Sequence, residues 1–102
     1  MSDIQSLINT VNEFRDERNW RQYHNPKDLA ISISIEAAEL LEDFQWINSE
    51  KAINENKKNI REEIADVLIY SLMLVSDLEL DVKDIVEEKI LKNGKKYPVS
   101  NN

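Results

Sequence analysis

The chain has 102 residues, of which 41% are hydrophobic and 32% charged, so it has room for one small domain. Its one glycine and lack of cysteine exclude phosphate loops built from several glycines, disulfides and thiolate metal sites. The formal net charge of -7 and the lack of a long apolar run argue against a nucleic-acid or membrane partner, and we expect a cytoplasmic protein.

The first predicted helix covers residues 2–18. Ser2 and Gln5 have the spacing of a capping box, and apolar residues then recur at helical spacing. A polar and aromatic loop follows as far as Asn25, which has the pattern of an N-cap before a proline at the first helical position.

The second predicted helix runs from Pro26 to about Ile47. Its segment 31–35 alternates as a strand would, but the run continues over 36–41 into strong helix formers at helical spacing. We therefore predict helix throughout this region.

The second half of the chain predicts two further long helices. After a polar connector over 48–59, which has room for a short helix, the longest helix is predicted over 60–78. A fourth begins at Asp81 and is closed by Gly94 as its C-cap, before an extended tail. The pattern as a whole predicts an all-α fold, with a subunit of the antiparallel four-helix bundle type.

The segment 67–75 is apolar on nearly every side of its helix. A helix that is apolar all round is buried all round, and a chain of this length has too little material to cover it alone. The sequence therefore predicts a homo-oligomer. We expect a tetramer, built as a dimer of dimers, rather than a dimer.

Two acidic pairs stand on the second and third of these helices: Glu36 with Glu39, and Glu63 with Asp66. At about 100° per residue, each pair flanks the apolar stripe of its helix at matching angles. If the two stripes pack together, the four carboxylates converge at one edge of the interface. Oxygen ligands without histidine or cysteine suit Mg²⁺, or Mn²⁺ in its place. The alternative is a solvated acidic face paired with the basic residues of 57–61.

Four blocks of sequence carry a resemblance to a known family. The central two contain the pattern E-x-x-E, a variable gap and E-x-x-D. These blocks resemble the MazG-like nucleotide pyrophosphohydrolases, and in particular the dCTP pyrophosphatase-like branch of the all-α NTP pyrophosphatase superfamily. The blocks are residues 17–26, 36–46, 62–70 and 89–98.

The resemblance covers residues 4–98, so we expect a single MazG-like helical domain over 1–98 and a tail over 99–102. It implies hydrolysis of a nucleoside triphosphate, dCTP or a related deoxynucleotide, to the monophosphate and pyrophosphate, in control of the nucleotide pool. It also implies that Mg²⁺ is the cofactor. The catalytic and metal-binding residues would be Glu36, Glu39, Glu63 and Asp66. One of these carboxylates would accept the proton of the attacking water, and we choose Glu39 because the second acid of its helix could face both metals.

The resemblance places substrate contacts in the aromatic loop and near the C-terminus. Aromatic rings stack on a base, and basic groups offset the charge of pyrophosphate. The structural alternatives are a loop hydrogen bond for the histidine, a core role for the second tryptophan, a helix cap for the asparagine and a solvated basic tail. The implied residues are Trp20, His24 and Trp46 for the base, Asn93 for a base edge, and Lys89, Lys96 and Tyr97 for the pyrophosphate.

Other functions remain open from the residues themselves. The all-α dUTPases and the phosphoribosyl-ATP pyrophosphohydrolases share this architecture, and a non-catalytic helical oligomerisation module is a further alternative. The complete acidic pairs argue against the non-catalytic module, and the aromatic block at 17–26 favours the dCTP-like branch.

Overall fold

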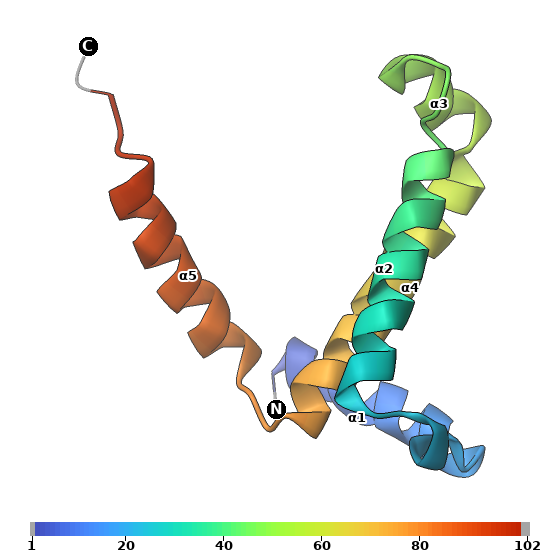
Figure 1. The fold of residues 1–102 in the computed structure, drawn as a ribbon, viewed down its shortest axis with the longest axis vertical. Helices are drawn as coiled ribbons and strands as arrows, with labels where there is room; N and C mark the ends of the chain where they lie inside the picture. The colour runs from blue at the N-terminus through green and yellow to red at the C-terminus, as the bar shows by residue number, and fades with distance from the viewer. Residues whose placement is uncertain (1, 101–102) are drawn as a thin grey trace.

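A computed structural model describes residues 2–100 of the chain (Figure 1). These residues contain helices and no strand, so the predicted all-α class is confirmed, and the strand-like segment 31–35 is helical. The elements in chain order are α1 (Asp3–Glu17), the 3-10 helix η1 (Trp20–Tyr23), α2 (Pro26–Glu42), α3 (Ser49–Glu55), α4 (Lys57–Asp77) and α5 (Val82–Lys96).

The predicted starts of α1, α2 and α5 are confirmed by their caps, whereas α4 begins three residues before the predicted position 60, at Lys57. At each of the confirmed starts a side-chain oxygen before the helix accepts a hydrogen bond from a backbone N–H of the first turn, which otherwise has no partner within the helix. These bonds are Gln5 N to Ser2 Oγ at 3.1 Å, Asp28 N to Asn25 Oδ1 at 2.8 Å, and Asp84 N to Asp81 Oδ1 at 3.0 Å.

The predicted end of α2 is wrong by about one turn. The helix ends at Glu42, before Ile47, because the N–H groups of 43–45 bond to carbonyls three residues back and tighten the chain. Trp46 then takes a left-handed conformation, with φ of 69°, which turns the chain away from the helix axis. The connector that follows contains α3, which lies within the region 48–59 where the sequence leaves room for a short helix.

The predicted end of α5 is also wrong. The helix continues through Gly94 to Lys96, and the N–H of Tyr97 bonds to the Asn93 carbonyl at 2.7 Å. Gly94 has no positive φ, so it does not close the helix. A glycine inside a helix costs only about 1 kcal/mol, which helical hydrogen bonds on both sides can offset. The predicted tail therefore starts at Tyr97, and its last two positions lie outside the described residues.

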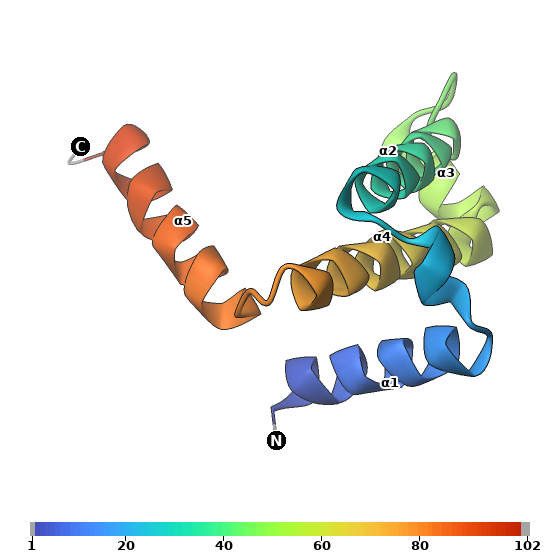
Figure 2. The same cartoon turned by 60° about the horizontal axis from the view of Figure 1, so that its bottom comes forward.

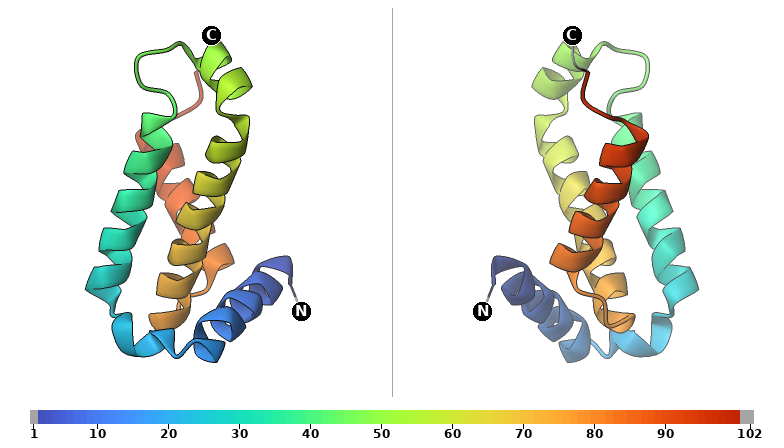
Figure 3. Two further views of the ribbon diagram at one scale, coloured as in Figure 1. Left: turned by 90° about the vertical axis from the view of Figure 1, so that its right-hand side faces the viewer. Right: turned by 90° about the vertical axis from the view of Figure 1, so that its left-hand side faces the viewer.

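The packed part of the chain is an antiparallel pair, α2 and α4, with α3 at one end and α1 against α4 at the other (Figures 1 and 3). Each helix of this part contributes one buried apolar side chain to a small core: Ile8, Leu29, Ala52 and Met73. The core therefore draws on every helix except α5.

Helix α5 leaves the others at an angle and does not pack along any helix of the described chain (Figures 1 and 2). Its apolar side chains Val86, Ile90 and Leu91 are exposed, Ile90 by 62%, and so are several on α4, including Leu68 by 56%. No helix among the described residues is long and apolar enough to cross a membrane. Exposed apolar side chains thus lie on α5 as well as on the packed helices.

Candidate active site

The acidic pair on α2 lies within electrostatic reach of the acidic pair on α4. Glu36 is half-buried, and its Oε2 atom is buried without a hydrogen-bond partner. Burial raises the pKa of Glu36, and the Glu39 carboxyl and the charge of Asp66 raise it further. Glu39 is the exposed member of the set.

Glu63 on α4 lies against a carboxyl that the sequence reasoning did not select, that of Asp43. A hydrogen bond between two carboxyl groups requires a proton on one of them, and this contact raises the pKa of Glu63 to about 7, together with burial and the charges of nearby acids. No N–H or hydroxyl donor satisfies the buried atoms Glu63 Oε2 and Asp43 Oδ2. A signal for Asp43 exists in the sequence, because it stands four residues after Glu39 on the same helical face.

Tyr70 is a second residue that the sequence reasoning missed. It follows Asp66 by four residues on α4, so both lie on one face of the helix. Burial raises the pKa of the Tyr70 hydroxyl, and the charges of Glu36, Asp66 and Glu39 add to this shift. Its hydroxyl is therefore a polar neighbour of the acidic residues.

The acidic residues have no basic partner in the described chain. No ion pair joins any of them to the basic residues of 57–61, which disfavours the solvated, paired acidic face. The described side chains also include no group of three or more acids or histidines already drawn together around a cation position. The buried oxygens without partners nevertheless suit a divalent cation, because it offsets their charge and accepts their lone pairs. The donor set fits Mg²⁺.

The raised pKa of Glu63 predicts that the metal-free protein loses stability as the pH rises. The pKa of Glu63 is about 7 in the folded state against an ordinary value of 4.5. Its contribution to the free energy of unfolding is therefore complete below pH 4.5 and is lost as the pH rises through 7. Burial lowers the pKa of His24, which acts in the opposite sense, so a mutant must isolate the Glu63 contribution.

We expect the melting temperature of the EDTA-treated protein to fall with rising pH less in Glu63→Gln than in wild type, because glutamine cannot ionise. The variant Glu62→Gln is the control, since Glu62 is the exposed neighbour on the same helix. Parallel pH profiles for wild type and Glu63→Gln would contradict the prediction.

Three aromatic rings form a group where α1 meets η1. The Trp20 ring meets Phe14 edge to face at 5.3 Å and His24 at 6.3 Å. The Nδ1 atom of His24 is buried and unpartnered, so the alternative of a loop hydrogen bond from this atom is not realised. Trp20 remains 38% exposed, so part of its side chain is accessible to a ligand.

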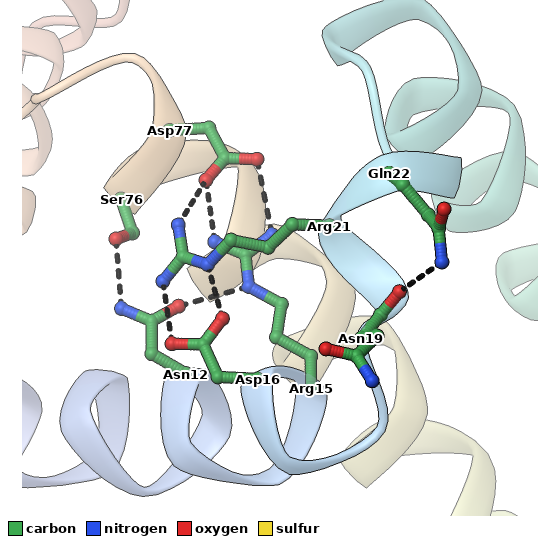
Figure 4. A network of polar contacts seen from close by, with 8 residues as sticks. All are labelled: Asn12, Arg15, Asp16, Asn19, Arg21, Gln22, Ser76 and Asp77. Atoms are coloured by element: carbon green, nitrogen blue, oxygen red, sulfur yellow. Dashed lines mark hydrogen bonds and ion pairs between the residues drawn. The ribbon is translucent and has the colours of Figure 1, made fainter.

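A polar network ties this aromatic group to the end of α4 (Figure 4). Arg15 is fully buried and makes two hydrogen bonds to the Asp77 carboxylate. Arg21 of η1 forms an ion pair with Asp16, and its Nη1 atom lies 3.5 Å from Asp77 Oδ1. Arg15 and Arg21 are more than 50 residues from Asp77 in sequence, so no local pattern reveals their contacts with it. The network fixes η1, and with it Trp20, against α4.

The remaining predicted substrate residues lie far from the aromatic group. Trp46 follows the opposite end of α2, which at 1.5 Å per residue is about 25 Å long. It is 96% exposed, so it is not a core residue of this chain. The other four are exposed on α5 and just after it, and the Lys96 ammonium lies 5.3 Å from the Tyr97 ring. These four are Lys89, Asn93, Lys96 and Tyr97.

Known proteins are similar to this chain in sequence and in fold. The MazG-like family model matches residues 31–102. The dCTP pyrophosphatase 1 of Mus musculus is 34% identical over 92 residues, which are 85% of this chain and 54% of that protein. The Homo sapiens protein of that name is 33% identical over 91 residues, 84% of this chain and 54% of that protein. The chain thus spans about half the length of these relatives.

A crystal structure of a pyrophosphatase from Archaeoglobus fulgidus DSM 4304 has the same fold. It superposes with a TM-score of 0.91 at 46% sequence identity, over 97% of this chain and 95% of that one. The family model, the relatives and the fold all indicate the same family. The chain belongs to the MazG-like family.

Proposed function

We propose that this chain is a Mg²⁺-dependent nucleoside triphosphate pyrophosphohydrolase, which cleaves dCTP or a related deoxynucleotide between the α and β phosphates. The observation that carries the proposal is that carboxylates of α2 and α4 lie within electrostatic reach of one another and have no basic partner among the described residues. The names of the relatives support the substrate class, since they are dCTP pyrophosphatases.

The four carboxylates at positions 36, 39, 63 and 66 would hold Mg²⁺, or Mn²⁺ in its place. Bound magnesium neutralises triphosphate charge and polarises the phosphorus under attack. Glu39 is the residue that we assign to the proton of the attacking water, because it is exposed to solvent where the other three are half-buried. The raised pKa of Glu36 makes that side chain the more reluctant to ionise before a cation binds.

The experiment that tests the proposal is a screen of the standard dNTPs and NTPs for pyrophosphate release with and without Mg²⁺. Magnesium-dependent release, greatest with dCTP or a related deoxynucleotide, is the expected result. The absence of release from every nucleotide would contradict the proposal and favour a non-catalytic module.

Trp20 is the residue that we assign to stacking on the base, with His24 beside it. Trp20→Ala should raise KM for the preferred dNTP about 5- to 150-fold, since a stacked base is worth about 1 to 3 kcal/mol. Tyr23→Ala is a matched control, because Tyr23 is another exposed aromatic residue of η1. Steady-state kinetics and thermal unfolding on one preparation separate binding from folding. An unchanged KM with a large loss of stability would make Trp20 a core residue.

The complete site is proposed to need more than one chain. Trp46 cannot reach the aromatic group of its own subunit, because the length of α2 separates the two. The substrate residues of α5 cannot reach it either, because α5 projects away from the packed helices (Figure 1). A second subunit would cover the exposed apolar residues of α4 and α5 and complete the antiparallel bundle of four helices. Assembly and substrate binding are thereby linked.

We predict a homo-oligomer, a tetramer in preference to a dimer, that dissociates on Ile90→Glu. Ile90 is 62% exposed in one chain, so the charge costs little in a free subunit, whereas an unpaired charge inside an interface costs several kcal/mol. Lys95→Glu, on the opposite side of α5, is the control. Light scattering at micromolar concentration measures the outcome. A monomeric wild-type protein would contradict the prediction.

A further inference from the structure

The end of α2 carries a fifth acidic side chain beside the proposed metal-binding residues. Asp43 caps the helix and keeps a helical conformation, with φ of -63° and ψ of -20°. At about 100° per residue it projects within about 40° of both Glu36 and Glu39. Asp43 therefore continues the acidic face of α2 by one turn, toward α3.

The carboxylate of Asp43 lacks the partners that a structural side chain has. Its Oδ2 atom is buried, and no N–H or hydroxyl group bonds to it. No ion pair joins it to a basic residue of the described chain, and its neighbour across the helix pair is another acid, Glu63. Two acids in contact without a cation are costly when both are ionised.

The backbone of Asp43, by contrast, is firmly held. Its N–H bonds to carbonyls of α2, and its carbonyl oxygen accepts a hydrogen bond from Asn56 Nδ2 at 2.7 Å. Asn56 directly precedes α4, so this bond ties the end of α2 to the start of the helix that carries Glu63. The backbone thus keeps the Asp43 carboxylate beside Glu63 without any use of its side-chain oxygens.

We propose that Asp43 is a fifth carboxylate ligand of the divalent cation site, acting beside Glu63 at its α3 end. The inference rests on the proposed function, because it requires the cation that this function uses. It adds to the E-x-x-E and E-x-x-D residues a ligand that neither motif contains. A cation between the two carboxylates relieves their repulsion and accepts the lone pairs that the protein leaves unused.

The test is Mn²⁺ binding to the intact, metal-free protein, followed by the electron paramagnetic resonance signal of free Mn²⁺ at about pH 8.5, where carboxyl groups are ionised. Asp43→Asn should weaken Mn²⁺ binding about tenfold or more. Asp43→Glu should restore part of it, because the carboxylate returns. Glu42→Gln replaces the exposed acid directly before Asp43, and this variant should bind Mn²⁺ as tightly as wild type does. Without metal, Asp43→Asn should melt no lower than wild type, since the Asp43 side chain holds no structural bond and its loss of charge relieves the repulsion with Glu63.

The outcomes separate the inference from the proposed function. Wild-type affinity in Asp43→Asn, with weakened binding in Asp66→Asn, overturns the fifth ligand and leaves the proposed function standing. No binding to wild type overturns both. If Asp43→Asn melts at a lower temperature without metal and Asp43→Glu recovers no affinity, Asp43 is structural and the inference fails.

Discussion

Glu63→Gln is expected to reduce turnover by at least about 100-fold while the helical fold stays intact. Glutamine keeps the size of the side chain but removes a negative charge from the proposed cation site. The same change reduces repulsion with Asp43, so the metal-free variant should fold at least as well as wild type above pH 7. Asp66→Asn should have a similar effect on turnover.

The matched control for this experiment is Glu62→Gln. Glu62 lies next to Glu63 on α4, is exposed and takes part in no ion pair of the described chain, so its replacement should leave turnover close to wild type. Circular dichroism checks the fold, and turnover is measured at saturating Mg²⁺. Near-wild-type activity of Glu63→Gln under these conditions would contradict the assignment of the site.

The largest loss of stability is expected for Asp77→Ala, at about 3 to 5 kcal/mol of unfolding free energy. Arg15 is fully buried, and Asp77 is the carboxylate that neutralises it, so removal of Asp77 leaves an unpaired charge inside the protein. The variant should also loosen η1, because Arg21 loses one of its two acidic partners. Denaturant unfolding monitored by circular dichroism measures the loss.

Asp16→Ala is the control for Asp77→Ala. It removes the other acidic partner of Arg21, but both members of that pair are about half exposed to screening solvent, so the expected loss is small. Comparable small losses for the two variants would show that Arg15 is not held as the structure places it.

Helical periodicity predicted much of the fold because most starts and faces of these helices depend on local residues. The N-caps at Asn25 and Asp81 lie at the predicted positions, and the alternating segment 31–35 is helical as predicted. The helix ends were less predictable. The end of α2 depends on a tightened last turn and on the left-handed Trp46, a conformation that a tryptophan side chain does not signal.

The acidic neighbourhood was predictable because the angles of two amphipathic helices place their carboxylates on matching edges. Asp43 was missed because the reasoning considered acids three residues apart, whereas Asp43 is four residues from Glu39 and seven from Glu36. The burial of Arg15 depends on Asp77 in a distant helix, which no local pattern reveals. The position of α5, which packs along no helix of the described chain, is likewise not encoded in its own periodicity.

The most direct test of the central claim is the identity of the products formed from dCTP and Mg²⁺. Chromatography of the nucleotides, with a parallel assay of pyrophosphate and of inorganic phosphate, resolves the bond that is cleaved. The account predicts dCMP and pyrophosphate in equal amounts, formed only when Mg²⁺ is present and lost in Glu63→Gln. Formation of dCDP and inorganic phosphate, or turnover that persists in EDTA, would contradict it.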